Sequence, residues 1–316
     1  MTTNARLRSF VALADTGSVR AAARQLVVTE SSISSSVGAL ASEVGVALVD
    51  RAGRGVRLTP AGERYAEYAR RILGLHDEAL RAARGQADPE HGSIRLAAVT
   101  TAGEYLMPNL LAAFCAEHPG IAIGLEVGPR GVVWQMLRRH EVDLVVAGRP
   151  PDGLDVAVRA VSPNTVVVVG PPAVARDFAP DTATWLLRER ESGMRATTVA
   201  LLDALGVAPR QLTLGSHGAV VAAAASGLGV TLVSRQAVQQ ELESERLVEL
   251  PVPGTPMARP WHAVTHRETT APTHLLVDHL LRNPRFGWLR AEATDVPRPT
   301  GRAPASAGPS AARSSV

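Results

Sequence analysis

Residues 7–73 read LRSFVALADTGSVRAAARQLVVTESSISSSVGALASEVGVALVDRAGRGVRLTPAGERYAEYARRIL, and this stretch decides the fold of the N-terminal part of the chain. Apolar residues recur at helical spacing over residues 5–14 and again, after an interruption at residues 16–17, over residues 19–26. Ser18 stands directly before the second helix, where its hydroxyl can accept a hydrogen bond from an unpaired backbone amide. The pattern predicts two short helices that cross closely, because alanines dominate the second one.

A third helix is predicted over residues 30–43, with Thr29 as its N-cap. Ile33, Val37 and Leu40 share one face, which we expect to pack inward. The opposite face carries short side chains, namely Glu30, Ser31, Ser34, Ser35 and Gly38. A capped helix of this kind after a capped short helix is typical of a recognition helix, whose serine hydroxyls can contact base edges or phosphates in the major groove. The alternative is an ordinary polar surface helix.

A wing is expected next, because Val46 and Leu48 pair with Val56 and Leu58 as two short strands around residues 50–55. Three arginines lie on or beside its tip, namely Arg51, Arg54 and Arg57. An arginine at such a tip can reach phosphates or the minor groove. A solvated hairpin is the alternative.

Double-stranded DNA is therefore the predicted partner of this module. The predicted contact residues are Ser18, Arg20, Thr29, Glu30, Ser31, Ser32, Ser34, Ser35, Arg51, Arg54 and Arg57. The charge distribution agrees, because residues 1–87 carry 12 arginines against 8 acidic residues, whereas residues 93–290 carry 18 of each. A positive surplus belongs on the part of a protein that meets phosphates.

One long helix should begin at Thr59 and Pro60, since proline is favoured at the first helical position, and continue without a proline to about Arg84. A stripe at spacings of three and four follows it for several turns, with Tyr65, Tyr68, Ile72, His76 and Leu80 as its main members. Such a stripe predicts a seam between two copies of the helix. A homodimer would present two DNA-binding heads to a symmetric operator, and a homotetramer would do the same.

Strands and helices alternate beyond a polar Gly/Pro hinge at residues 84–92. Buried strands are predicted at residues 94–99, 121–127, 142–147, 165–169, 185–187, 212–214, 230–233 and 261–265. Helices are predicted at residues 103–117, 132–141, 192–205, 218–225, 236–242 and 273–282. The first part reads as a βαβαβ unit with a parallel sheet, and the whole predicts two α/β lobes that bind a small molecule in the cleft outside their strand ends.

Several loops should converge on that cleft. The predicted ligand-contacting residues are Thr100, Thr101, Gly128, Arg130, Gly148, Arg149, Ser192, Gly193, Arg195 and His217. Arg130, Arg149 and Arg195, together with two helix N-termini, predict an anionic ligand such as a phosphate or a carboxylate. The alternatives are that the threonines only cap a helix, that Arg130 and Arg149 are solvated, and that His217 is a capping or core residue.

The remaining composition excludes several classes of protein. Cys115 is the one cysteine and lies in an apolar run, so we expect a buried thiol and no disulfide within the chain. No apolar run reaches ~18 residues, and the N-terminus lacks a signal-peptide core, which predicts a cytoplasmic protein without membrane contact. We find no catalytic triad, phosphate-binding loop or metal-ligand spacing, so we expect no enzyme activity, catalytic residue, metal or cofactor. Residues 291–316 are rich in Pro, Ala, Ser and Gly and are predicted to be disordered.

The motifs of the first 62 residues resemble the LysR-type transcriptional regulators. The helical block LRSFVALADTGSVRAAARQL, the T-x-S-x-x-S block at residues 29–34, GVALVDR and GRGVRLTPAG follow that family's pattern in order. The resemblance extends to about Leu289. It implies an α+β multidomain fold with a winged helix-turn-helix over residues 1–58, a linker and dimerisation helix over residues 59–87, and a two-lobed, periplasmic-binding-like effector domain over residues 93–290. Lobe one would hold residues 93–163 and 263–290, and lobe two residues 164–262.

The chain departs from the family at a few positions. Family members commonly carry glutamine where this chain has Glu30, arginine where it has Gly38, and phenylalanine near Val19 and Val49. The carboxylate of Glu30 would face phosphates or base acceptors, or would accept a hydrogen bond from a cytosine amino group. The operator sequence is therefore left open.

The segment at residues 148–155, GRPPDGLD, resembles the branch that regulates carbon-fixation (RuBisCO) operons, whose effectors are phosphorylated metabolites. The loop at residues 190–195 departs from the Gly/Ser/Thr-rich form common in that branch. The predicted function is a homo-oligomeric, ligand-responsive transcription factor with DNA, an anionic metabolite, a second copy and RNA polymerase as partners. The alternatives are an enzyme built on the lobe pair and an anion-responsive binding protein that does not act through DNA.

Overall fold

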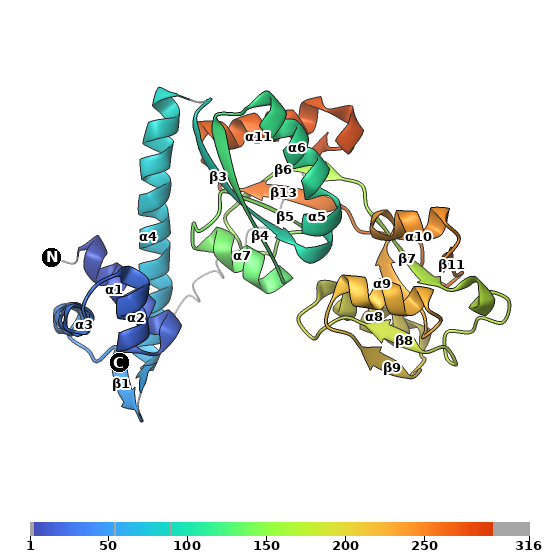
Figure 1. Ribbon diagram of the computed structural model, residues 1–316, viewed down its shortest axis with the longest axis horizontal. Helices are drawn as coiled ribbons and strands as arrows, with labels where there is room; N and C mark the ends of the chain where they lie inside the picture. The colour runs from blue at the N-terminus through green and yellow to red at the C-terminus, as the bar shows by residue number, and fades with distance from the viewer. Residues whose placement is uncertain (1–2, 54, 89, 293–316) are drawn as a thin grey trace, which may run out of the picture.

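The computed structural model describes residues 3–53, 55–88 and 90–292 (Figure 1). Its N-terminal unit packs three helices around one core: α1 (Asn4–Thr16), α2 (Val19–Leu26) and α3 (Glu30–Val44). Phe10, Ile33 and Leu40 are fully buried in that core. The predicted caps of the second and third helices are confirmed, because Ser18 accepts a hydrogen bond from the Ala21 amide and Thr29 accepts one from the Ser32 amide.

The wing is a two-stranded antiparallel hairpin of β1 (Val49–Ala52) and β2 (Gly55–Leu58). The prediction that its first strand runs through Val46 and Leu48 is wrong, since that strand begins at Val49. Leu48 is 1% exposed and belongs to the core of the helices instead. An inward-facing leucine before the strand therefore mimicked the alternation of the strand itself.

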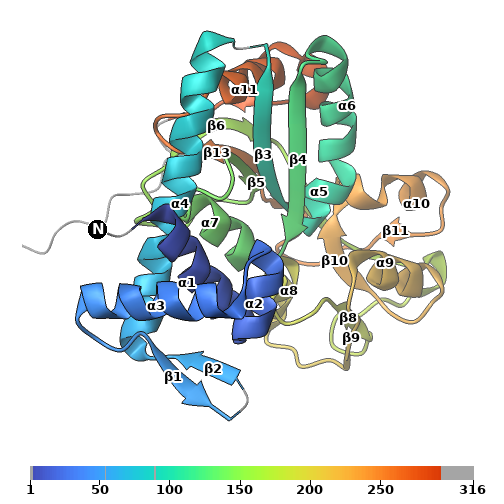
Figure 2. The same ribbon diagram turned by 60° about the vertical axis from the view of Figure 1, so that its left-hand side comes forward.

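Helix α4 (Pro60–Ala87) is one helix of 28 residues that begins next to the wing and runs along the outer side of lobe one (Figures 1 and 2). Thr59 caps it by accepting a hydrogen bond from the Gly62 amide. Two glycines let it approach its neighbours closely. A Cβ at Gly62 would lie 1.9 Å from the Leu48 carbonyl oxygen, and one at Gly74 would lie 2.0 Å from the Arg139 carbonyl oxygen.

Lobe one contains a six-stranded sheet in the order β14-β6-β13-β5-β3-β4. Its strands are β3 (Gly92–Val99), β4 (Ile121–Gly128), β5 (Leu144–Ala147), β6 (Ala157–Ser162), β13 (Trp261–Thr265) and β14 (Leu289–Arg290). Its helices are α5 (Thr100–Tyr105), α6 (Met107–Glu117), α7 (Arg130–Arg138), α11 (Ala271–Arg282) and the 3-10 turn η3 (Pro284–Phe286). The predicted parallel βαβαβ unit is confirmed for β3, β4 and β5, but the sheet as a whole is mixed, because β13 pairs antiparallel with β5 and β6.

The single helix predicted over residues 103–117 is two helices. Pro108 lies in the first turn of α6, where its missing amide is tolerated, and the chain turns at Leu106 before it. The prediction of a buried thiol in this region is also wrong, since Cys115 is exposed on α6. Leu110 and Phe114 of the same apolar run pack inward, but the position of Cys115 on the helix faces out.

Lobe two is built around β7 (Thr165–Gly170), which pairs antiparallel with β10 (Thr231–Ser234), β11 (Val248–Glu249) and β12 (Met257–Ala258). A parallel pair, β8 (Trp185–Leu187) and β9 (Gln211–Thr213), lies beside it. The helical elements are η1 (Pro172–Val174), α8 (Gly193–Leu205), α9 (His217–Ala225), η2 (Arg235–Val238) and α10 (Gln239–Glu243). The chain therefore crosses between the lobes twice, before β7 and after β12 (Figure 1).

No helix among the described residues is both long enough and apolar enough to span a bilayer.

Gly74→Ala should lower the free energy that holds helix α4 against lobe one by about 1–3 kcal/mol, because the new methyl group overlaps the Arg139 carbonyl. The loss occurs although alanine is the better helix former. Hydrogen exchange of the amides at residues 138–143 should become faster. Gly218→Ala is the matched control, since a Cβ at Gly218 meets no atom within 4 Å, and unchanged exchange in both variants would contradict this packing.

Candidate functional site

The predicted DNA-contacting face is exposed at the start of α3. Glu30, Ser31, Ser34 and Ser35 are all solvent-exposed. Thr29 does more than the sequence indicated, since its hydroxyl lies 2.9 Å from that of Ser31 and 2.8 Å from that of Ser32. These hydroxyls form one polar cluster at the N-terminus of the helix, where backbone amides also favour negative groups such as phosphates.

The other predicted contact residues surround this cluster. Ser18 is half-buried and serves as the cap of α2, while Arg20 is exposed on that helix. Arg51 and Arg57 are exposed on the two strands of the wing, and Arg54 lies outside the described residues.

The sequence analysis missed Val27, which precedes the recognition helix. Its side chain is 90% exposed and its backbone is left-handed, with φ 55°. A β-branched residue rarely adopts that conformation, so the turn between α2 and α3 is strained at an exposed position. No periodicity marks such a residue, because it belongs to neither helix.

The apolar stripe of α4 is exposed to solvent over most of its length. Tyr68, Ile72 and Leu80 are 58%, 49% and 45% exposed, and Leu75, which was not predicted, is 53% exposed. Tyr65 needs correction, because its ring packs edge-on against Phe10, with ring centroids 5.6 Å apart, within the helical core. His76 is exposed as expected. Large apolar side chains on one exposed helix face are what an interface with a second copy requires.

A pocket lies between the lobes at the crossing strands. Seven of the predicted residues line it: Thr100, Thr101, Gly128, Arg130, Gly148, Ser192 and Gly193. A wider cavity of about 1060 Å³ adjoins this pocket, and four residues line both of them. Arg149, the eighth predicted residue, lines the wider cavity. Lobe one supplies the loops after β3, β4 and β5, and lobe two supplies the start of α8.

Two predicted pocket residues lie elsewhere. The guanidinium of Arg195 donates hydrogen bonds to the Arg188 carbonyl and to the Thr213 hydroxyl, which connects α8 to the ends of β8 and β9 within lobe two. Arg195 does not line the pocket. His217 is 4% exposed, and its ring packs against that of Tyr105 at a centroid distance of 5.1 Å. It is a core residue near the contact between the lobes, which was the alternative left open.

Two arginines of the pocket were not predicted. Arg188 is 7% exposed and forms two hydrogen bonds of 2.8 Å with the Glu189 carboxylate. Arg259 lies between β12 and β13 in the second crossing segment, where its backbone amide donates to the Asn164 carbonyl and its carbonyl accepts from the Asn164 side chain. Arg188 directly follows the strand predicted at residues 185–187, so its position at a strand end was a signal that could have indicated it. Arg259 lies where the chain crosses between the lobes, and no spacing indicated it.

Arg130 and Arg259 carry the positive charge of this pocket. Both lie close to Gly193, since a Cβ at Gly193 would lie 3.4 Å from an Arg259 nitrogen and 3.8 Å from Arg130 Cδ. Burial, and then the charge of Arg130, lower the pKa of Arg259. No carboxylate among the described residues forms an ion pair with either arginine. Two neighbouring guanidinium groups without a counter-ion favour an anion between them.

The N-terminus of α8 adds to this field. Ser192 caps the helix by accepting hydrogen bonds from the amides of Met194 and Arg195. Ser192 also lines the pocket. Because α8 has 13 residues, its first turn presents partial positive charge to the pocket. The arrangement can therefore bind a dianion or a carboxylate between the lobes.

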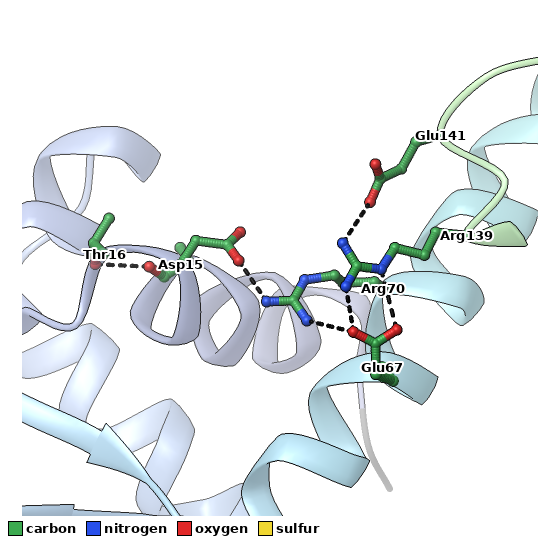
Figure 3. A network of polar contacts seen from close by, with 7 residues as sticks. Asp15, Thr16, Glu67, Arg70, Arg139 and Glu141 are labelled. Carbon is green, nitrogen blue, oxygen red and sulfur yellow. Dashed lines mark hydrogen bonds and ion pairs between the residues drawn. The ribbon is translucent and has the colours of Figure 1, made fainter. Parts of the chain in front are cut away.

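A polar network connects the DNA-binding unit to lobe one through α4 (Figure 3). Arg70 of α4 pairs with Asp15 of α1, and Glu67 of α4 pairs with Arg139 in the loop after α7. The hydrogen bond from Arg139 lowers the pKa of Glu67, against the opposing effect of burial. Arg70 also contacts Glu67, so adjacent ion pairs join lobe one to α1.

Comparisons with known proteins agree with this organisation. The bacterial regulatory helix-turn-helix family of the lysR type matches residues 5–63, and the LysR substrate binding domain matches residues 87–285. The RuBisCO operon transcriptional regulator of Acidithiobacillus ferrooxidans is 34% identical over 267 residues, which is 82% of this chain and 86% of that protein.

Two solved structures are also similar. CbnR complexed with its target DNA covers 89% of this chain and 99% of that one, with a TM-score of 0.62 and 22% identity, which shows the fold. The regulatory domain of CcmR from Synechocystis, in complex with 2-PG, covers 60% of this chain and 96% of that one, with a TM-score of 0.54 and 27% identity.

Ser34→Asp should abolish binding to operator DNA and leave the oligomer intact. Ser34 is exposed on the outer face of α3, where a carboxylate would meet phosphates or base acceptors. A gel shift measures the binding, and light scattering measures the oligomer. Retained binding would show that another face of α3 meets the groove.

The stability of lobe two should fall with acidification through His217. Burial lowers the pKa of His217 to about 4, and the charge of Arg188 lowers it further. The unfolded chain therefore binds the proton first, so the stability present above pH 6.5 is lost as the pH falls toward 4. The loss is roughly 2 kcal/mol at pH 5 for this shift. In urea titrations followed by tryptophan fluorescence, His217→Asn should flatten the pH profile by that amount, and parallel profiles would contradict it.

Proposed function

The chain belongs to the LysR family of DNA-binding transcriptional regulators, and we propose that it controls a carbon-fixation operon in response to an anionic metabolite bound between its lobes. The relative from Acidithiobacillus ferrooxidans, a RuBisCO operon regulator, supports the operon. The GRPPDGLD segment at residues 148–155, part of which lines the cleft, points to the same branch. The chain is a regulator and not an enzyme. We place it in the cytoplasm, where its DNA and RNA polymerase are.

The observation that carries the ligand proposal is that the side chains of Arg130 and Arg259 both lie beside Gly193. Their charges are not neutralised by a described carboxylate, and the capped N-terminus of α8 lies beside them. A phosphorylated metabolite matches these donors, because guanidinium groups and helix amides both bind phosphate oxygens. The 2-PG in the CcmR domain is a ligand to test first.

The ligand would act on the angle between the lobes. Arg130 belongs to lobe one, whereas Ser192 belongs to lobe two and Arg259 to the segment that crosses between them. An anion that contacts all three stabilises the closed arrangement by its differential affinity for that state. Because lobe one is joined to α4 and α1 by the Glu67–Arg139 and Arg70–Asp15 pairs, closure would reposition the DNA-binding head.

DNA binding would use α3 in the major groove and the wing beside it. Pairing of two α4 helices through Tyr68, Ile72, Leu75 and Leu80 would place two heads on an imperfect inverted repeat.

The first experiment is a fluorescence anisotropy titration with the DNA upstream of the protein's own gene, at several salt concentrations, with and without 2-PG. Specific binding that weakens with salt and changes with 2-PG is the expected result. Specific binding that no phosphorylated metabolite changes would retain the regulator and reject the anion site. Absence of specific binding would reject the operator proposal.

Arg259→Gln should remove the response to 2-PG while leaving operator affinity within about twofold, because Arg259 lines the pocket and does not touch the DNA-binding unit. Ligand affinity, measured by calorimetry, should fall by roughly 10-fold to 100-fold for the loss of a charge-assisted contact. Arg210→Gln is the control, since Arg210 is exposed on lobe two outside the pocket. Equal ligand affinities in the two variants would contradict the site.

A further inference from the structure

A cluster of metal-ligating side chains lies outside both sites, where helix α4 meets lobe one. It consists of Glu78 from α4, His140 from the loop after α7 and His266 directly after β13. Each residue offers one ligand atom, and these atoms lie within 4.8 Å of one another. In the part of the chain that the structure describes, no other three such residues meet in this way. The sequence carried no signal for it, because the three residues are 62 and 126 positions apart.

His266 is oriented as a metal ligand requires. Its ring makes a hydrogen bond with the Leu137 backbone. Its Nε2 atom is buried and has no hydrogen-bond partner among the described residues, so the bond to Leu137 uses Nδ1. A ring whose Nδ1–H donates to a carbonyl keeps a lone pair on Nε2, which is the tautomer that binds metal ions in proteins.

His140 completes the cluster from an unusual backbone position. Its φ is 57°, a left-handed conformation that turns the chain after α7. Its Nδ1 contacts the Glu78 carboxylate, and its ring stacks on that of His266 with centroids 3.8 Å apart and planes 6° apart. Strained backbone that holds polar groups together is frequent at binding sites.

The surroundings admit a cation. The three side chains line a cavity of about 450 Å³ between α4 and lobe one. Arg71, Arg138 and Arg267 line that cavity and are matched there by Glu78, Asp155 and Glu268. Arg267 is also paired with Asp155, so the positive charge of the wall is balanced.

We propose that Glu78, His140 and His266 form a binding site for a divalent transition-metal ion of the zinc class, which joins helix α4 to lobe one. Two imidazoles and one carboxylate are a ligand set that Zn²⁺ accepts, with a water molecule in the fourth position. A metal ion lies in the plane of each imidazole that binds it, so the parallel rings cannot both bind as they stand. Binding therefore turns the His140 ring out of the stack, while His266 stays held by Leu137.

The consequence concerns the same junction as the Glu67–Arg139 pair. An ion at this site would hold one turn of α4 to two separate loops of lobe one, and would strengthen the connection by which the lobes reach the DNA-binding head. Binding of the ion itself does not depend on the proposed operon or ligand.

The test is calorimetric titration of the untagged, chelator-treated full-length chain with Zn²⁺, and absorption spectroscopy with Co²⁺ in its place. We expect one Zn²⁺ per subunit and visible Co²⁺ bands of a four-coordinate site. Affinity should fall by roughly 100-fold or more in His266→Asn and in Glu78→Gln, since each removes one of three ligands. Glu78→Gln keeps the test decisive if His266→Asn does not fold, which circular dichroism of the metal-free proteins establishes.

His118→Asn is the matched control. His118 also pairs with a glutamate, Glu90, and its Nε2 is likewise buried without a partner among the described residues, but no third ligand joins it. This variant should bind Zn²⁺ as the wild type does. Equal affinity of the wild type and Glu78→Gln, loss of binding in His118→Asn, or no stoichiometric binding by the wild type would each overturn the proposal.

Discussion

The close packing of helix α4 on lobe one is the contact on which the rest of the structure depends. Gly74 leaves room for the Arg139 carbonyl directly against the helix. The Arg139 side chain then reaches Glu67, which lies about two turns earlier on the same face of α4. A side chain at Gly74 would separate the two elements, because backbone atoms cannot give way as a flexible side chain does. The same junction brings together Glu78, His140 and His266. It determines where the DNA-binding head lies relative to the ligand cleft.

A second constraint applies to the cleft, where two arginine side chains have no carboxylate among the described residues to neutralise them. Arg188 has its own carboxylate in Glu189, whereas Arg130 and Arg259 lie close together beside Gly193, and neither forms an ion pair with a carboxylate among the described residues. Both guanidinium groups are half-buried and donate only to uncharged oxygens of the described residues, so the pair repels itself in the empty state and an anion relieves that repulsion. In the function that we propose, this charge links closure of the lobes to the ligand, and α4 links it to the DNA-binding unit.

The accuracy of the sequence predictions followed the range of the interactions involved. Caps and helical periodicity act within one turn, so the helices around Ser18 and Thr29 were placed to within a few residues. The wing strand was misplaced because Leu48 faces the helical core, and Cys115 was misjudged because one exposed position can lie within an apolar run. Four strands, β6, β11, β12 and β14, were not predicted, since three of them have only two residues and β6 lacks a clear alternation.

By itself, the sequence determined the class of the protein, namely a capped helix-turn-helix, a long helix and two α/β lobes, because those elements depend on local propensity and on the spacing of apolar residues. It also indicated most loops of the cleft, since strand ends in an α/β lobe meet at one edge. Only the tertiary structure decided which arginines enter the pocket, replacing Arg195 by Arg188 and Arg259. It alone brought Glu78 to His140 and His266. Contacts of this kind depend on how distant segments pack, and no spacing along the chain encodes them.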